Sequence, residues 1–468
     1  MLEIEIKMPQ LGQTTDEVRI IKWLVNEGQK IKAGQPLCEV ETDKVTMEIE
    51  SVAGGVVLKL LAIPGDIVIA GDVIAIIAEK EKAPEEMKVA GGSKGKRKDF
   101  NTSLEKKHKE IIAVSPGKIK EPVSAGQTIK TISLDLNEKK KLLGKLGNKK
   151  AIHIYRKMLE IRLFEERIRL LFLEGKMPGT IHQYIGMEAC AVGVCGALEN
   201  TDVIASTHRP HGHAIAKGIS IKEITAELYG KVSGCCKGKG GSMHIGDLGK
   251  GCLPAIAIVG ANLPIVGGMA LAFKMRGEPR VAVSFFGDGA SNEGTFHEAL
   301  NMAAIYDVPA IFVCENNQYG ASTNIKDTAK VKNIAERVCA YGMRGAIAYG
   351  MDVLSVYAAA KEQVELARKG DGPSLLELKT FRLCGHSRRD PCNYVSRQEK
   401  EYWKKRDPIV LYEKLLLSEK IIDKKSIEVL KSGIEAEIDD ALEFAKNSPE
   451  PAPEDTYNDL YINMEVPR

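Results

Sequence analysis

The stretch Val281-Ala282-Val283-Ser284-Phe285-Phe286-Gly287-Asp288-Gly289-Ala290 determines how the rest of the chain is interpreted. A mostly apolar run ends directly in a Gly-Asp-Gly turn, and residues 296–302, which follow, have the pattern of a helix. A strand, a glycine turn and the N-terminus of a helix together present free backbone N–H groups to an anion. This stretch therefore predicts a diphosphate site at the end of a buried strand.

A second polar cluster follows the next apolar run along the chain. Residues 310–314 are apolar and lead into Glu315-Asn316-Asn317-Gln318-Tyr319-Gly320. Mg²⁺ prefers octahedral oxygen ligands and needs few carboxylates when diphosphate oxygens supply the rest. Asp288 and an asparagine carbonyl meet that need. Gly-Asp-Gly alone would indicate no more than a turn, but the Asn-Asn pair at this distance favours a magnesium-diphosphate site.

Short apolar runs alternate with amphipathic helices from about residue 151 onward. The helices begin with residues 154–164, and the apolar runs lie at 203–205, 281–286, 310–314 and 375–378. Runs of this length, separated by helices, are typical of buried parallel strands. Ligands bind such sheets at the carboxyl ends of the strands. We therefore expect an α/β parallel-sheet domain over residues 151–468.

Residues 1–80 contain short strand-like segments and an internal repeat. The segment 27–37 is echoed by residues 64–74, and both alternate apolar and polar residues around glycine. Two similar halves of this kind predict a small, flattened, all-β barrel with approximate two-fold symmetry. Lys44 would then lie in the turn between two strands, at an exposed hairpin tip that a modifying enzyme could reach.

Residues 81–150 have the composition of a mobile linker. They contain basic runs at 94–98 and 105–109 and few large apolar residues, although the more apolar part between 111 and 132 could hold a strand pair. A basic run could also bind nucleic acid, but neither run contains Phe, Tyr or Trp, so we favour the linker. A flexible linker of about 70 residues would span roughly 45 Å.

The composition is that of an ordinary globular protein. The chain has 468 residues, 44% of them hydrophobic and 28% charged, with a net charge of +3, which gives no reason to expect nucleic acid or an anionic membrane as a partner. Its apolar runs are shorter than the roughly 20 residues of a membrane-spanning helix. Strand-like alternation starts at residue 1, where a leader segment would have to lie, so we expect a cytoplasmic protein. Ten cysteines are scattered, with only Cys235 and Cys236 adjacent, and do not indicate a disulfide framework.

Two known families share these motifs. From about residue 151 the chain resembles the alpha subunit of the thiamine-diphosphate-dependent component of 2-oxo acid and acetoin dehydrogenase complexes. Residues 1–80 resemble a lipoyl domain, because of the acidic flank of Lys44, the two similar halves and the opening Met8-Pro9-Gln10-Leu11-Gly12. Biotin carriers are near relatives, but they place methionines on both sides of the lysine, where this chain has Asp43 and Val45.

The resemblance implies a set of site residues. Those that would bind thiamine diphosphate, through magnesium, the diphosphate or the aminopyrimidine, are Arg209, Ile258, Val259, Gly260, Asp288, Gly289, Ala290, Asn317 and Tyr319. Asp288, Asn317 and the carbonyl of Tyr319 would be the Mg²⁺ ligands. His182, facing the active-site funnel, and His386, near the reacting carbon, are the implied catalytic residues. Lys44 would carry covalently bound lipoate.

Three positions leave their roles open. Cys384 stands where some family members have another histidine, and His208 where some have tyrosine. Ser387 lies in a loop that is phosphorylated in some relatives, where a phosphate would repel the diphosphate. A plain loop hydroxyl is the favoured interpretation of Ser387. For the remaining histidines, a structural hydrogen bond is the simpler interpretation.

The resemblance also implies a reaction and partners. The cofactor would cleave pyruvate or acetoin, and the hydroxyethyl adduct would reductively acetylate a lipoyl group for acetyl-CoA formation. In two-chain family members the activating glutamate lies on the beta subunit, and no second thiamine-binding half is found in this sequence. We therefore expect two alpha and two beta chains. Dihydrolipoamide acyltransferase, dihydrolipoamide dehydrogenase and a lipoate-attaching enzyme are further implied partners.

Several alternatives stay open. Pyruvate and acetoin give the same adduct, so the motifs do not separate them, whereas a branched-chain 2-oxo acid is less favoured. The chain could also be a non-catalytic lipoyl carrier or an inactive thiamine-binding regulator. The Asp288 and Asn317 pair argues against the carrier, and the loop around His386 argues against the regulator.

Overall fold

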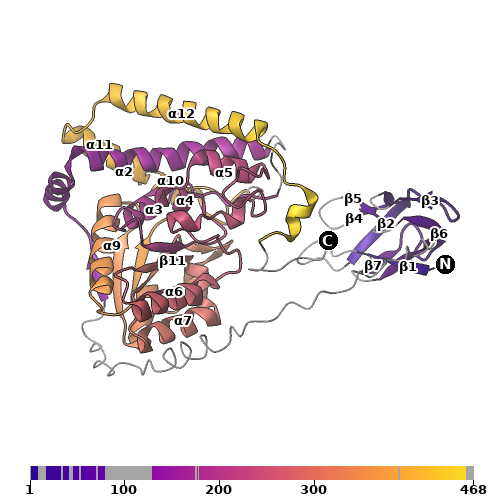
Figure 1. Ribbon diagram of the computed structural model, residues 1–468, viewed down its shortest axis with the longest axis horizontal. Helices are drawn as coiled ribbons and strands as arrows, with labels where there is room; N and C mark the ends of the chain where they lie inside the picture. The colour runs from indigo at the N-terminus through magenta and orange to yellow at the C-terminus, as the bar shows by residue number, and fades with distance from the viewer. Residues whose placement is uncertain are drawn as a thin grey trace, which may run out of the picture. The chain divides into compact units, whose positions relative to one another are not determined.

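Figure 1 shows the computed structural model of the chain. The structure describes residues 2–8, 17–32, 35–41, 46–51, 54–69, 72–79, 129–173, 177, 179–387 and 390–459. The chain divides into two compact units, residues 1–102 and residues 103–468. Across the described residues, no helix is both long enough and apolar enough to cross a membrane.

The first unit consists of two four-stranded antiparallel sheets, with strand orders β1-β8-β6-β3 and β5-β4-β2-β7. The strands are β1 (Leu2–Lys7), β2 (Glu17–Trp23), β3 (Lys30–Ile31), β4 (Pro36–Glu41), β5 (Thr46–Glu50), β6 (Gly55–Leu60), β7 (Ile67–Ile69) and β8 (Val73–Glu79). The repeated segments 27–37 and 64–74 form equivalent parts of the two sheets. β3 and β7 are edge strands, and β4 and β8 each lie second from the opposite edge. The predicted flattened barrel with two similar halves is confirmed.

Apolar side chains from both sheets fill the first unit. Ile20, Val40, Ile74 and Ile77 are among its fully buried residues. This alternation of buried and exposed positions is what the sequence pattern predicts for a small barrel. β4 and β5 pair with Glu41 opposite Thr46, and the predicted turn position of Lys44 lies outside the described residues.

The second unit contains a six-stranded, fully parallel sheet with the order β10-β11-β12-β16-β15-β9. Its strands are β9 (Ile129–Ile132), β10 (Val203–Ala205), β11 (Ala282–Gly287), β12 (Ala310–Asn316), β15 (Arg344–Tyr349) and β16 (Ser374–Lys379). A small hairpin follows β12 and is formed by β13 (Tyr319–Gly320) and β14 (Thr323–Asn324). The predicted α/β parallel-sheet domain is confirmed.

Helices cover both faces of this sheet (Figure 1). They are α2 (Leu136–Leu173), α3 (Glu188–Cys195), α4 (His211–Lys217), α5 (Ile221–Leu228), α6 (Asn262–Arg276), α7 (Gly294–Ile305), α8 (Ile325–Thr328), α9 (Val353–Arg368), α10 (Arg397–Lys404), α11 (Pro408–Ser418) and α12 (Lys424–Asn447). Residues of α2, α3 and α9 share one apolar core with β11, and residues of α6 and α7 share the other. Because β11 is buried on both faces, its sequence is a nearly continuous apolar run.

The second unit begins earlier than residue 150. Residues 129–150, which the sequence analysis places in the linker, form β9 and the first part of α2. β9 pairs with β15 at the edge of the sheet, and Gly147, with a φ of 73°, interrupts α2 close to the expected boundary. The short alternating runs of β9 and β15 resemble half-exposed strands rather than the apolar runs used to predict the sheet.

Candidate active site

Two loops meet at the carboxyl edge of the sheet, after β11 and β12. These neighbouring parallel strands end with Gly287 opposite Glu315, so Asp288 and Asn317 follow at the same edge. A Cβ atom placed on Gly289 would lie only 3.3 Å from the Cα of Gly320, which shows that the two loops touch. The structure thus brings the predicted metal and diphosphate residues together, while their role as ligands stays a prediction.

Asp288 is a buried carboxylate without a partner. It is 1% exposed, and neither carboxylate oxygen has a partner with hydrogen-bond geometry among the described residues, although the backbone N–H groups of Asp288 and Asn317 and the charge of Arg382 lower its pKa in part. Burial raises the pKa of Asp288 to about 6. Buried charges of this kind are costly unless a partner or a metal compensates them. A hard divalent cation fits here, because the neighbouring Asn317, itself 8% exposed, adds an amide oxygen that, among the described residues, accepts only the backbone N–H of Tyr319 at 3.3 Å.

Two buried guanidinium groups lie at the same edge. Arg209, which precedes α4, donates to the carbonyl oxygens of Gln183 and His386, and Arg382, which follows β16, donates to the carbonyl oxygens of Cys384 and Ala321. Burial and the nearby Arg382 lower the pKa of Arg209 to about 10. Among the described residues no carboxylate forms an ion pair with either guanidinium. A polyanion such as a diphosphate would supply the missing charge.

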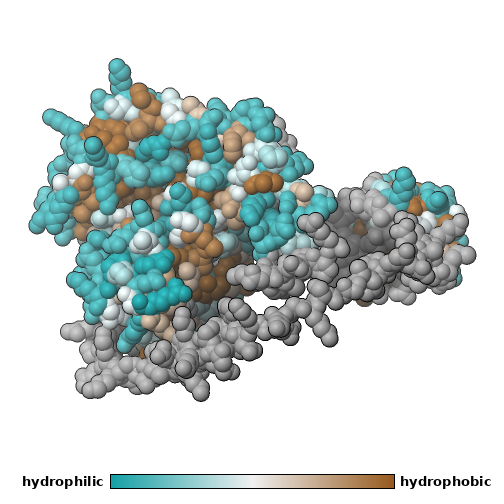
Figure 2. Space-filling model, in the orientation of Figure 1, coloured by the Kyte–Doolittle hydropathy of each residue, from teal (hydrophilic) through white to brown (hydrophobic). Residues whose placement is uncertain are grey.

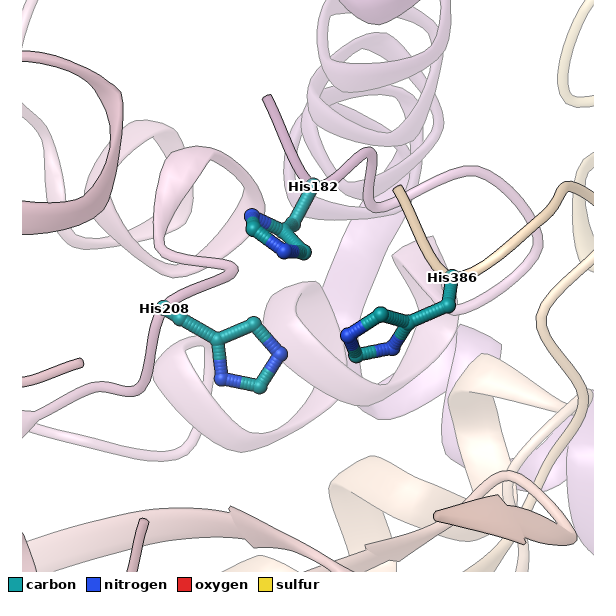
Figure 3. Close-up of side chains that lie close together, drawn as sticks. All are labelled: His182, His208 and His386. Carbon is teal, nitrogen blue, oxygen red and sulfur yellow. The ribbon is translucent and has the colours of Figure 1, made fainter. Parts of the chain in front are cut away.

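Three histidines, His182, His208 and His386, converge with their rings close together (Figure 3). The ring centroids of His182 and His208 are 4.8 Å apart, those of His182 and His386 are 5.1 Å apart, and those of His208 and His386 are 5.5 Å apart. Nδ1 of His182 and Nδ1 of His386 are buried without a hydrogen-bond partner in the described part of the chain. The two predicted catalytic histidines therefore face one another, and His208 completes the group.

Burial and the two arginines keep these imidazoles neutral. They lower the pKa of His182 to about 3, that of His208 to about 2 and that of His386 to about 4, with burial as the largest cause in each case. A neutral imidazole can accept a proton from a reacting group or donate a hydrogen bond to it. The cluster therefore supplies hydrogen-bonding and weakly basic groups beside two guanidinium groups.

The lowered pKa values predict a pH dependence of stability. Between about pH 4 and 6.5 the unfolded chain binds protons on these histidines and the folded chain does not, so the histidines should lower the free energy of unfolding as the pH falls through this range, whereas Asp288, whose pKa is raised, contributes in the opposite direction. We expect His208→Asn to reduce that slope by about 1 kcal/mol per pH unit, after allowance for solvent screening. Urea unfolding of the cofactor-free protein at several pH values measures how the free energy of unfolding changes with pH. An unchanged slope would contradict the neutral cluster.

The other predicted residues are placed as follows. Ile258 and Val259 are 74% and 48% exposed, and they precede Gly260, which has a φ of 83°. Ala290 is buried in the turn after Asp288. Tyr319 is buried, and its hydroxyl donates to Glu399 at 2.9 Å.

The remaining histidines of this region are held by structural hydrogen bonds. His211 lies between Glu165 and Ser242, at 3.1 and 3.0 Å, and His213 bonds Ser206 at 2.7 Å. His244 bonds the carbonyl oxygen of Ala255 at 2.9 Å. These contacts agree with the simpler interpretation that the sequence favoured for them.

Sequence reasoning missed Arg382 and undervalued His208. Arg382 connects the loop after β12 with the histidine cluster. It donates a hydrogen bond to the carbonyl oxygen of Ala321 in that loop, and it lowers the pKa of all three histidines of the cluster. The available signal was its position just after an apolar strand, at the same edge as Asp288 and Asn317. His208 was noted only as a departure from the family pattern.

Comparison with known proteins decides the family. Residues 156–454 match the model of the family described as dehydrogenase E1 component, and residues 4–77 match that described as biotin-requiring enzyme. The chain belongs to the dehydrogenase E1 component family. The dehydrogenase E1 component match contains every predicted residue of the candidate active site, and the second match contains Lys44.

Curated relatives agree with this assignment. The chain is 44% identical over 321 residues to the alpha subunit of acetoin:2,6-dichlorophenolindophenol oxidoreductase from Bacillus subtilis (strain 168), covering 68% of this chain and 96% of that protein. It is 42% identical to the protein of the same name from Cupriavidus necator, with the same coverage. The pyruvate dehydrogenase E1 component subunit alpha of Porphyra purpurea is 39% identical over 65% of this chain and 91% of its own length. The chain is thus similar to alpha subunits of oxidoreductases of the dehydrogenase E1 component family.

Proposed function

We propose that this chain supplies the magnesium-diphosphate half of a thiamine-diphosphate active site and, on a fused arm, a lipoyl acceptor. One observation carries the proposal. A buried carboxylate without a partner, on Asp288, lies at the same sheet edge as two buried guanidiniums that have no carboxylate partner in the described residues. These opposite charges do not pair with each other. A divalent cation and a polyanion bound together would satisfy both.

Different residues of the chain would bind the Mg²⁺, the diphosphate, the aminopyrimidine and the substrate. Asp288, Asn317 and the Tyr319 carbonyl would hold Mg²⁺, while Gly289, Ala290 and Arg209 would hold the diphosphate. Ile258, Val259 and Gly260 would present backbone groups to the aminopyrimidine. When bound, thiamine diphosphate supplies the nucleophilic carbon that attacks the substrate carbonyl. His182 and His386 would orient the substrate and transfer protons at its oxygen, and burial would exclude water from them.

A second chain is needed to complete this site. In two-chain family members the glutamate that activates the cofactor lies on the beta subunit, and the sequence contains no second thiamine-binding half. Hydrophobic residues gather at the surface over the region of β11 and α6 (Figure 2), and a cavity of about 310 Å³ lies between α6 and α7. Exposed apolar surface of this kind is typical of a protein interface. We propose that a beta subunit covers this face in an assembly of two alpha and two beta chains.

The substrate proposal rests on the relatives. We propose acetoin first, because the two acetoin oxidoreductase relatives match at 44% and 42% identity over 96% of their own length. Pyruvate is the second candidate, because pyruvate dehydrogenase subunits match at up to 39%. With its beta subunit, Mg²⁺ and thiamine diphosphate, the enzyme should show a kcat/KM at least about tenfold higher for acetoin than for pyruvate, measured with an artificial electron acceptor. A higher kcat/KM for pyruvate would make pyruvate the first candidate substrate. If the enzyme turned over neither compound, the proposed reaction would be contradicted.

The arm is proposed to carry lipoate on Lys44. The family matched by residues 4–77 does not separate lipoate from biotin, but Asp43 and Val45 replace the methionines that flank the lysine of biotin carriers. A tethered acceptor would have an effective concentration on the order of a millimolar or less at the site, enough to exceed a dilute free domain. A lipoate-attaching enzyme would modify Lys44. Dihydrolipoamide acyltransferase and dihydrolipoamide dehydrogenase would complete the complex. A cytoplasmic location stays a prediction.

Lys44→Arg tests the arm. In a complex that contains no other lipoyl domain, acetyl-CoA formation should fall at least about 100-fold, because no tethered disulfide remains to accept the acetyl group. Oxidation of acetoin with an artificial electron acceptor should change less than about twofold, since that assay bypasses the arm. Lys22→Arg, on β2 of the same unit, is the matched control. If acetyl-CoA formation is unchanged in the Lys44→Arg complex, the arm does not carry the acetyl group.

A further inference from the structure

Cys235 and Cys236 are adjacent thiols that no step of the proposed reaction uses. Both are partly exposed, in the loop that follows α5. Their sulfurs and a carboxylate oxygen of Glu227 all lie within 4.8 Å of one another. The Cys236 sulfur also contacts the carbonyl oxygens of His244 at 3.2 Å and Gly246 at 3.5 Å. The pair therefore belongs to the hydrogen-bonded framework of this loop.

A metal site does not explain the cluster well, because Glu227 is already occupied. Its Oε2 accepts the backbone N–H groups of Cys236 at 2.8 Å and Gly238 at 2.9 Å, and its Oε1 accepts those of Gly240 at 2.7 Å and Gly241 at 3.0 Å. The carboxylate is buried and has few lone pairs left for a cation. Glu227 instead holds the loop in shape.

The loop supports the segment proposed to contact the aminopyrimidine. His244 Nδ1 lies 2.9 Å from the carbonyl oxygen of Ala255, and the N–H of Ala255 donates to the carbonyl of Ile245 at 3.0 Å. Gly246 packs so tightly that an added Cβ would lie 2.3 Å from Pro254. Ile258 follows three residues after Ala255. A change of the loop at Cys236 would therefore reach the cofactor segment through a few short contacts.

We propose that Cys235 and Cys236 form an oxidation site for hydroperoxides, and that their vicinal disulfide loosens this loop. The Cys236 thiolate attacks the peroxide, forming a sulfenic acid and releasing an alcohol or water. The Cys235 sulfur then attacks the sulfenic sulfur, forming the disulfide and releasing water. The two thiols lose two electrons in total, and the peroxide O–O bond accepts them. The hydrogen bond from Cys235 lowers the pKa of Cys236, which favours Cys236 as the attacking thiolate.

The disulfide would break specific contacts. Adjacent Cα atoms are about 3.8 Å apart, shorter than the usual span of a disulfide, so ring closure must distort the peptide between the two cysteines. That peptide carries the Cys236 N–H that bonds Glu227. The S–H contact with His244 is lost as well, since a disulfide has no proton. Strained, accessible disulfides are readily reduced, so the change would be reversible.

Peroxide titration of the reconstituted two-chain enzyme tests the site. After treatment with tert-butyl hydroperoxide and alkylation of free thiols, mass spectrometry should find the tryptic peptide of residues 232–237 unalkylated and two hydrogens lighter. A dithiol reductant should restore both thiols. Cys235→Ser should form no disulfide in this peptide, and Cys339→Ser, at an exposed cysteine elsewhere, should behave as the wild type. Alkylation of both thiols at doses that oxidise Cys339, or sulfinic acid as the only product, would overturn the proposal.

The effect on the cofactor segment rests on the proposed function and has its own readout. Oxidation should weaken the apparent affinity for thiamine diphosphate about tenfold. The loop must regain its shape before the cofactor binds, and this costs about as much free energy as the lost hydrogen bond from the Cys236 N–H to the charged Glu227. The reductant should restore it, and the Cys235→Ser enzyme should keep its affinity after the same treatment. A disulfide that forms without changing affinity would overturn the coupling. An enzyme that binds no thiamine diphosphate before oxidation would contradict the proposed function instead.

Discussion

Asp288→Asn is expected to weaken the Mg²⁺-dependent binding of thiamine diphosphate by about 100-fold or more. Loss of a group that merely supports a metal ligand commonly costs 10- to 100-fold in metal affinity, and Asp288 is proposed as the one carboxylate among the protein ligands. Catalytic turnover should fall with it. Isothermal calorimetry on the two-chain enzyme, with Mg²⁺ in excess, measures the change. Asp327→Asn, at an exposed position of α8, is the matched control and should bind like the wild type.

The same substitution should stabilise the cofactor-free protein. The pKa of Asp288 is raised from 3.8 to about 6, so at about pH 8 the folded state bears the cost of a buried carboxylate that the unfolded state does not. Removing the charge should raise the free energy of unfolding by roughly 1 to 3 kcal/mol. Denaturant unfolding without cofactor measures it. A variant that binds normally, or that is destabilised without cofactor, would contradict the assignment of Asp288 as a metal ligand.

The placement of Asp288 and Asn317 could be predicted because it follows from local rules. Each lies directly after an apolar run, and parallel neighbouring strands end at the same edge of a sheet. The repeat at 27–37 and 64–74 predicted the first unit for a similar reason, since two similar stretches of alternating residues indicate two similar halves of a small barrel. In both cases the signal lies within one or two elements.

Features that depend on distant segments could not be predicted in this way. β9 has only four residues and joins the sheet through β15, more than 200 residues away along the chain. The histidine cluster combines residues from before α3, before α4 and after β16. Burial and the charges of Arg209 and Arg382 lower the pKa of each of its members. Sequence spacing does not contain that information. The resemblance to a known family pointed to His182 and His386, but it did not point to Arg382.

The central claim is that this chain holds half of each active site and a partner chain holds the other half. The most direct test is steady-state oxidation of acetoin and pyruvate with an artificial electron acceptor, in the presence of Mg²⁺ and thiamine diphosphate. This chain alone, its beta subunit alone and the two together are assayed at equal concentration, with purity established by mass spectrometry. We predict that each chain alone has less than about a thousandth of the activity of the mixture, because the activating carboxylate and the diphosphate site lie on different chains. Substantial turnover by this chain alone would contradict the account.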